Sequence, residues 1–262
     1  MSDIVANGWT AVPLDPSKLF GGKPYRTVPA PLDPCDVVWP SDDPLVAEMQ
    51  AYAKKHLSQE MYNHSMRVYY FATTILQQQF PEYATGLSPS TLALACLLHD
   101  LGATEANMRA TRMSFDLYGG VRALSVLESA GAAPDQAAAV CECVLRHQDL
   151  GAEGAITLLG QLVQLATVYD NAGAHPLLLL PATATATAAA AGPGPGPGLG
   201  LAATVHADTR EAVVRLFPRR GWLGCFARVV ETETALKPWC HTTAIPGFAD
   251  TIRANELMRP YE

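Results

Sequence analysis

The sequence lacks a long apolar run. No stretch of about 18 apolar residues is free of charges and helix breakers, so we expect no membrane-spanning helix. The first residues place no basic segment before an apolar one, which argues against a secretory signal. From these two absences we expect a cytoplasmic protein without a membrane partner.

Basic residues are also scarce. The chain has 18 Lys and Arg against 25 Asp and Glu, a formal net charge of −7. No basic cluster interrupts this acidic balance, so we expect no nucleic-acid partner. With 49% apolar residues among 262, the chain can bury a full core in one domain with appendages.

The six cysteines form neither a disulfide pattern nor a zinc-binding quartet. Cys141 and Cys143 make a C-x-C pair, but no second pair accompanies it. Most of the six lie in apolar, helix-like segments. We interpret them as small buried residues in a reducing compartment.

Helical periodicity accounts for most of the chain. Polar capping residues or prolines stand where the periodic segments begin, and no strand pattern is convincing. The predicted class is therefore all-α, a helical bundle. The expected helices cover about 43–57, 58–80, 88–102, 114–131, 134–150, 157–171, 208–217 and 222–236.

Two segments depart from the helical pattern. Residues 1–42 are rich in proline and weakly periodic, so we expect an extended N-terminal arm against a domain formed by 43–262. Residues 181–200 are a low-complexity run of Ala, Thr, Gly and Pro with few large side chains to bury. We interpret them as a flexible surface insert.

A His-Asp pair ends the apolar run 91–102. A carboxylate buried beside an imidazole is costly unless a bound metal compensates it. His64 lies on the apolar face of the preceding helix, and Asp170 stands at the end of a later one. Alone, His64 would be interpreted as a core histidine. Together, His64, His99, Asp100 and Asp170 predict a site for one divalent metal between facing helices, with zinc favoured and iron or manganese also suitable.

The pattern H…HD…D is typical of the HD superfamily of metal-dependent hydrolases. Longer segments of the chain closely resemble fungal cyanamide hydratases. They are 7–13, 63–67, 96–102, 111–120, 146–151, 160–171 and 237–243. The resemblance covers nearly the whole length and fails mainly at about 174–205. It implies an HD-domain bundle that adds water to the small molecule cyanamide to give urea. We also expect the protein to be a homo-oligomer.

The resemblance implies a mechanism and candidate residues. A metal-bound hydroxide would attack the nitrile carbon, and the nitrogen would then need a proton. His147 lies in one of the resembling motifs and is a catalytic candidate. Glu105 and Thr104 are further candidates, because they follow the His-Asp turn and should lie close to the metal. Gln148 and Asn171 are candidates for hydrogen bonds to the substrate's amino group. Structural alternatives exist for each, since Glu105 also suits the first turn of a helix and the amides could satisfy backbone groups.

Two other functions remain open from the sequence. One is a one-metal HD phosphohydrolase acting on a nucleotide, and the other is a regulatory HD module whose metal only stabilises the fold. Two metals are disfavoured, since His147 is the one histidine between the His-Asp pair and Asp170. A structural ion pair of Arg67 with Asp100 or Glu105 is also expected. The arginines that could contact a phosphate are Arg67, Arg109, Arg112 and Arg146.

Overall fold

The computed structural model describes residues 3–151, 153–173 and 199–262. The sequence predicted a flexible insert at 181–200, and residues 181–198 of that segment lie outside these ranges. The described chain is all-α apart from one very short sheet, as the sequence predicted. None of its helices is both long and apolar enough to cross a bilayer.

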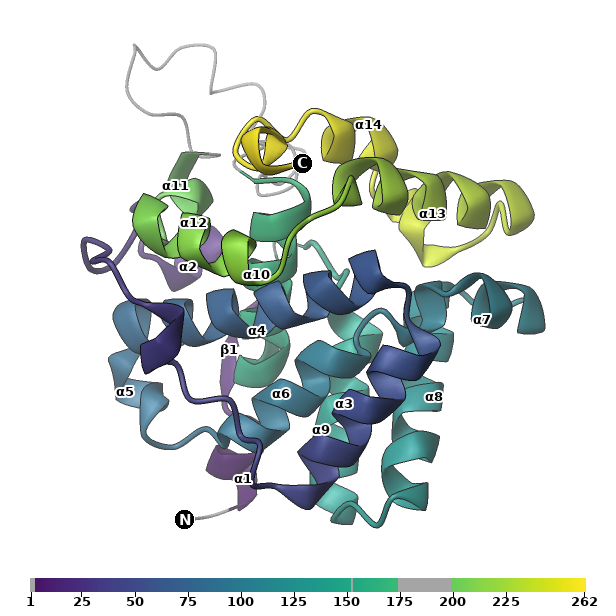
Figure 1. The fold of residues 1–262 in the computed structure, drawn as a ribbon, viewed down its shortest axis with the longest axis horizontal. Coiled ribbons are helices and arrows are strands. Elements are labelled where there is room, and N and C mark those ends of the chain that lie inside the picture. Colours follow the sequence, from purple (N-terminus) through teal and green to yellow (C-terminus); the bar gives the residue numbers. More distant parts are fainter. Residues whose placement is uncertain (1–2, 152, 174–198) are drawn as a thin grey trace.

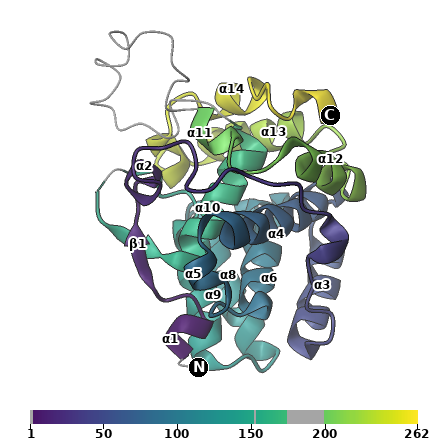
Figure 2. The same cartoon turned by 90° about the vertical axis from the view of Figure 1, so that its left-hand side faces the viewer.

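The helices lie on two sides of α4, the long helix Gln59–Gln79. Figure 1 shows α3, α6, α8 and α9 side by side on one side of α4, with α12, α13 and α14 on the other; the view in Figure 2 agrees. The bounds of the longer helices are α3 Pro44–His56, α6 Pro89–Leu98, α8 Phe115–Ser129, α9 Pro134–Arg146, α10 Leu158–Asn171, α12 Ala207–Leu216 and α13 Trp222–Leu236.

Shorter elements connect these helices. The short helices are α1 Asp3–Ala6, α2 Pro16–Leu19, α5 Pro81–Ala84, α7 Glu105–Ala110, α11 Leu199–Ala202 and α14 Phe248–Arg253. Turns of 3-10 helix cover Pro34–Asp36, Leu101–Ala103, His241–Ala244 and Arg259–Tyr261.

The predicted helix starts are confirmed. Ser58 accepts a hydrogen bond from Met61 N at 3.3 Å and thereby caps α4. Thr157 caps α10 in the same way, through Gly160 N at 3.0 Å. These side chains satisfy amide groups that a helix leaves without partners at its N-terminus, which is why the local sequence fixes where the helix begins.

The N-terminal residues include a strand that the sequence did not predict. β1 (Ala11–Pro13) pairs antiparallel with β2 (Ala155–Thr157), and Val12 lies opposite Ile156. Figure 2 shows β1 along one side of the helical body. The expectation of no strand was therefore wrong, because three residues are too few to display alternation.

A close approach of two glycines positions the His-Asp turn. A Cβ on Gly102 would overlap the carbonyl oxygen of Phe115 and come within 2.8 Å of Gly119 N. The turn Leu101–Ala103 therefore packs directly on the first turns of α8. This contact fixes the backbone that follows Asp100.

All six cysteines are free. Cys96, Cys143 and Cys240 are buried, as expected for small apolar residues. Cys35 is exposed and the other two are partly buried, so the interpretation of the cysteines as buried residues was wrong for Cys35.

Candidate metal centre

Three buried side chains bring metal-ligand atoms together. Among the described residues, His64, His99 and Asp100 place one such atom each within 4.8 Å of one another. His64 Nε2 lies 3.2 Å from His99 Nε2, and Asp100 Oδ2 lies 3.6 Å and 3.3 Å from these two nitrogens. The helix α4 supplies His64, and the C-terminal end of α6 supplies the other two.

Hydrogen bonds determine which ring nitrogens are free. His99 Nδ1 donates to the carbonyl oxygen of Cys96 at 2.8 Å, because that oxygen can only accept. His64 Nδ1 donates to Asp170 Oδ2 at 2.6 Å. Both Nε2 atoms therefore carry lone pairs that face each other.

The cluster fits a divalent cation. Asp100 Oδ2 is buried and has no hydrogen-bond partner in the described chain. Two facing lone pairs and an orphaned carboxylate oxygen repel one another, and a cation between them would satisfy all three. Two imidazoles and a carboxylate are donors that zinc, iron and manganese accept.

The protonation states of His64 and Asp100 agree with metal binding, whereas Asp100 raises the pKa of the neighbouring His99, whose ring a metal would have to deprotonate. Burial lowers the pKa of His64 to about 4, although Asp170 acts in the opposite direction. Burial alone would raise the pKa of Asp100, but the facing histidines, His99 first, outweigh it and hold the pKa below its usual range. A neutral His64 and an ionised Asp100 are the forms that coordinate metals.

The structure does not bring Asp170, the fourth predicted ligand, into this cluster. Its carboxylate meets the opposite ring nitrogen of His64 and is completely buried. Arg67 donates to it through Nε at 3.0 Å and Nη2 at 2.8 Å, and Arg219 donates through Nη1 at 2.5 Å. The carboxylate oxygens of Asp170 therefore accept hydrogen bonds from two guanidinium groups and from His64. Arg67 pairs with Asp170 rather than with Asp100 or Glu105, so that expectation was wrong.

Sequence reasoning missed two residues around His64. Arg219, completely buried, lies 49 residues beyond Asp170 in the chain. Trp222 stacks on the His64 ring, with centroids 4.4 Å apart, and donates its Nε1 to Asn171 Oδ1 at 2.7 Å. No local pattern distinguishes a buried arginine or tryptophan of this kind from a surface one.

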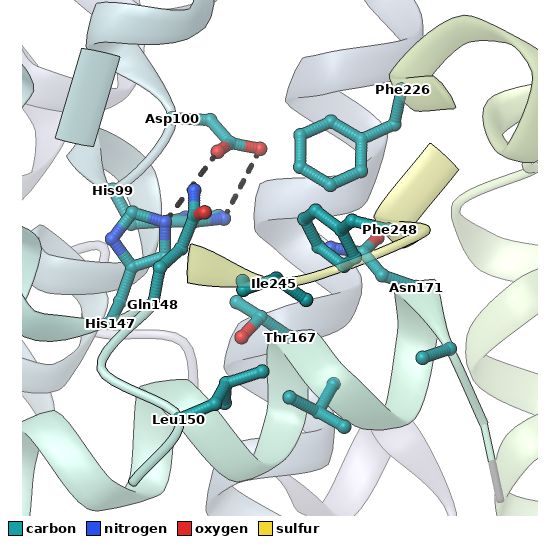
Figure 3. A pocket seen from close by; sticks show the side chains of 12 residues that line it. His99, Asp100, His147, Gln148, Leu150, Thr167, Asn171, Phe226, Ile245 and Phe248 are labelled. Atoms are coloured by element: carbon teal, nitrogen blue, oxygen red, sulfur yellow. Dashed lines mark ion pairs between the residues drawn. The ribbon is translucent and has the colours of Figure 1, made fainter. Parts of the chain in front are cut away.

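A small cavity adjoins the cluster. Figure 3 shows His147 and Gln148 beside His99, with Phe226 and Phe248 across the cavity. Its volume is about 20 Å³. One water molecule needs about 10–15 Å³ on this scale. The cavity therefore suits a molecule of a few atoms.

Two predicted residues face this cavity with free polar atoms. His147 Nδ1 donates to the carbonyl oxygen of Val144 at 2.7 Å, so its Nε2 carries a lone pair, 4.0 Å from Asp100 Oδ1. Burial lowers the pKa of His147 and favours the neutral ring. Both amide atoms of Gln148 are buried without a hydrogen-bond partner in the described chain. Asn171 also lines the cavity, but Trp222 occupies its oxygen.

The structure does not bring the other two catalytic candidates to the cavity. Thr104 caps α7 by accepting from Asn107 N at 3.3 Å. Glu105 has 75% of its side chain exposed and pairs with Arg109 at 3.0 Å. The turn Leu101–Ala103 directs the chain outward, and Figure 1 shows α7 at the edge of the molecule.

None of the four arginines considered for a phosphate is among the described residues that line the cavity. Arg67 is occupied by Asp170, and Arg146 pairs with Asp149 at 2.8 Å. Arg109 and Arg112 border a different depression, next to Trp239. The described residues therefore supply no phosphate clamp at the metal cluster.

Comparisons with known proteins agree with this geometry. The HD domain family matches residues 61–172, the segment that carries His64, His99, Asp100 and Asp170. The chain is 37% identical over 239 residues to the cyanamide hydratase DDI2 of Saccharomyces cerevisiae. It is equally similar to the cyanamide hydratase DDI3 of that yeast. Each match covers 91% of this chain and 91% of the yeast protein.

Proposed function

Because this chain belongs to the family of HD-domain cyanamide hydratases, as its motifs predicted, we propose that it adds water to cyanamide to give urea. The observation that carries this proposal is the small cavity beside the His-His-Asp cluster. Because one water molecule needs about 10–15 Å³, the cavity is close in size only to a ligand of very few atoms, and cyanamide has three non-hydrogen atoms. Drug-sized ligands occupy pockets of about 300–1,000 Å³.

The proposed cofactor is one zinc ion. His64, His99 and Asp100 would hold it, and Asp170, which the sequence predicted as a ligand, would act by orienting His64. Iron or manganese would accept the same donors. When bound, such an ion lowers the pKa of its water toward 7 and supplies hydroxide at neutral pH.

The residues of the cavity would manage protons and orient the substrate. His147 Nε2 carries the lone pair needed to take a proton from the water and return it to the nitrile nitrogen. A C–O bond forms, one C–N π bond breaks, and the resulting isourea tautomerises to urea. Gln148 would accept a hydrogen bond from the amino group, and the rings of Phe226 and Phe248 would exclude bulk water.

A product assay tests the proposal. The purified protein, with its metal content measured, is incubated with cyanamide, with dimethylcyanamide and with a panel of nucleotides. We expect urea from cyanamide, much slower turnover of the bulkier nitrile, and no phosphate. Phosphate release without urea would favour the phosphohydrolase. A metal-loaded protein without turnover would favour the regulatory module.

The cytoplasmic location and the homo-oligomeric state stay predictions. Gel filtration with light scattering measures the oligomeric state directly.

A further inference from the structure

A third carboxylate stands behind the metal centre. Glu262 Oε1 accepts a hydrogen bond from Arg219 Nε at 2.5 Å. The same guanidinium donates through Nη1 to Asp170, which in turn accepts from His64 Nδ1. A continuous line of hydrogen bonds therefore runs from Glu262 through Arg219 and Asp170 to His64.

Glu262 also holds the start of α13. Its Oε2 accepts from Leu223 N at 3.1 Å, in the first turn of that helix. The residue before the helix, Gly221, has no side chain to cap it. The first residue of α13, Trp222, stacks on His64. Glu262 thus reaches His64 by two routes, through Arg219 and through Trp222.

The side-chain charges along this line of hydrogen bonds balance only when Glu262 is included. Arg67, Arg219 and Asp170 are completely buried and together carry a net charge of +1. Glu262, with 22% of its side chain exposed, brings the sum to zero. A surplus positive charge in a buried network would oppose the binding of a cation at the neighbouring cluster, since charges inside proteins are weakly screened.

We propose that Glu262 is a positioning residue of the metal centre, which neutralises Arg219 and fixes α13 so that Asp170 and Trp222 hold His64 in its ligating orientation. This inference rests on the metal site of the proposed function. It does not depend on which small molecule the enzyme hydrates.

The test measures zinc affinity without using turnover. Glu262→Gln keeps the size and acceptor oxygen of the side chain and removes its charge, whereas Glu262→Asp keeps the charge. The matched control is Glu256→Gln, because Glu256 lies in the same tail and pairs with Arg259 at the surface, with 77% of its side chain exposed. The zinc dissociation constants of the metal-free proteins are measured by competition with a chromophoric chelator, and their melting temperatures are recorded without metal.

We expect Glu262→Gln to weaken zinc binding about 10–100-fold, the range for residues that orient metal ligands. Glu262→Asp should bind zinc nearly as tightly as the unmodified protein. The zinc dissociation constant of Glu256→Gln should stay within about twofold of that of the unmodified protein. A lower melting temperature of Glu262→Gln with unchanged zinc affinity would overturn the positioning role and leave a structural one. Equal losses in Glu262→Gln and Glu262→Asp would overturn the role of the charge. An unmodified protein that binds no zinc would overturn the metal site itself, and the positioning role with it.

Discussion

Trp222 lies flat against His64, with ring centroids 4.4 Å apart and ring planes 18° from parallel. The indole covers one face of the imidazole, and Asp170 holds its Nδ1. The ring is therefore fixed before any metal arrives, with Nε2 toward His99 and Asp100. Such preorganisation lowers the cost of assembling a metal site.

Replacing Asp170 tests the support of His64. Asp170→Ala should remove both metal and activity, since His64 loses the partner that orients it. The variant also leaves Arg67 and Arg219 buried without this carboxylate, which costs about 3–5 kcal/mol of stability. Metal analysis and urea denaturation measure the two effects. Full zinc occupancy in this variant would show that Asp170 neither binds the metal nor supports it.

His147 is expected to transfer protons rather than to bind metal. His147→Ala should keep its zinc and its fold, while the turnover of cyanamide falls about 10²–10⁴-fold. Zinc stoichiometry and urea release are measured on the same preparation. Loss of zinc would instead identify His147 as a ligand, and unchanged turnover would assign it a structural role.

Replacing Gln148 should stabilise the protein and weaken substrate binding. Gln148→Leu removes a buried amide without partners, whose cost is about 1–3 kcal/mol, so the melting temperature should rise. The KM for cyanamide should increase up to about tenfold, because the substrate's amino group loses a hydrogen bond worth roughly 0.5–1.5 kcal/mol. Gln50→Leu is the control, since Gln50 is bonded to the Tyr62 hydroxyl at 2.9 Å and its loss should not stabilise the protein. A Gln148→Leu protein that is less stable, with unchanged KM, would contradict the assignment.

The stability contributed by His241 should depend on pH. A 2.5 Å hydrogen bond to Asp116 is the main reason that the pKa of His241 is raised, and Asp149 and Glu233 add to it. Because the folded pKa lies above the unfolded value of about 6.5, this stabilisation is complete below that value and is lost as pH rises through the folded pKa. His241→Gln should therefore lose more unfolding free energy at pH 6 than at pH 9.

Denaturant unfolding at the two pH values measures this difference. His56→Gln is the control, because His56 lies at the surface against Tyr52 without an acidic partner among the described ion pairs. An equal loss in His241→Gln at both pH values would show that the pair with Asp116 does not titrate in this range.

The parts of the fold that depend on neighbours in sequence could be predicted. Ser58, Ser88 and Thr157 cap helices at the expected positions, because a cap acts on amides two or three residues away. Helical periodicity placed His64 on a buried face, and the apolar run before His99 placed the His-Asp pair at the end of a buried helix. These local signals were enough to predict that the three clustered side chains face the interior between two helices.

The rest depends on contacts between distant segments. Nothing near Asp170 in the sequence indicates that Arg219 would donate hydrogen bonds to its carboxylate. Nothing near Glu262 indicates that its side chain would bind the buried Arg219. Position in the chain also suggested that Glu105, close behind the His-Asp pair, would reach the site. Its helix points outward instead, since only the backbone path after Gly102 decides where that side chain lies.

The pairing of Val12 with Ile156 delays part of folding during synthesis. The ribosome must add 144 further residues after Val12 before its partner strand exists. At about 5–20 residues per second this takes roughly 7–30 s. Val12 and Leu14, which are buried in the finished protein, lack their partners Ile156 and Gly154 for that interval. During synthesis, the edge of β1 therefore stays unpaired until β2 has been added.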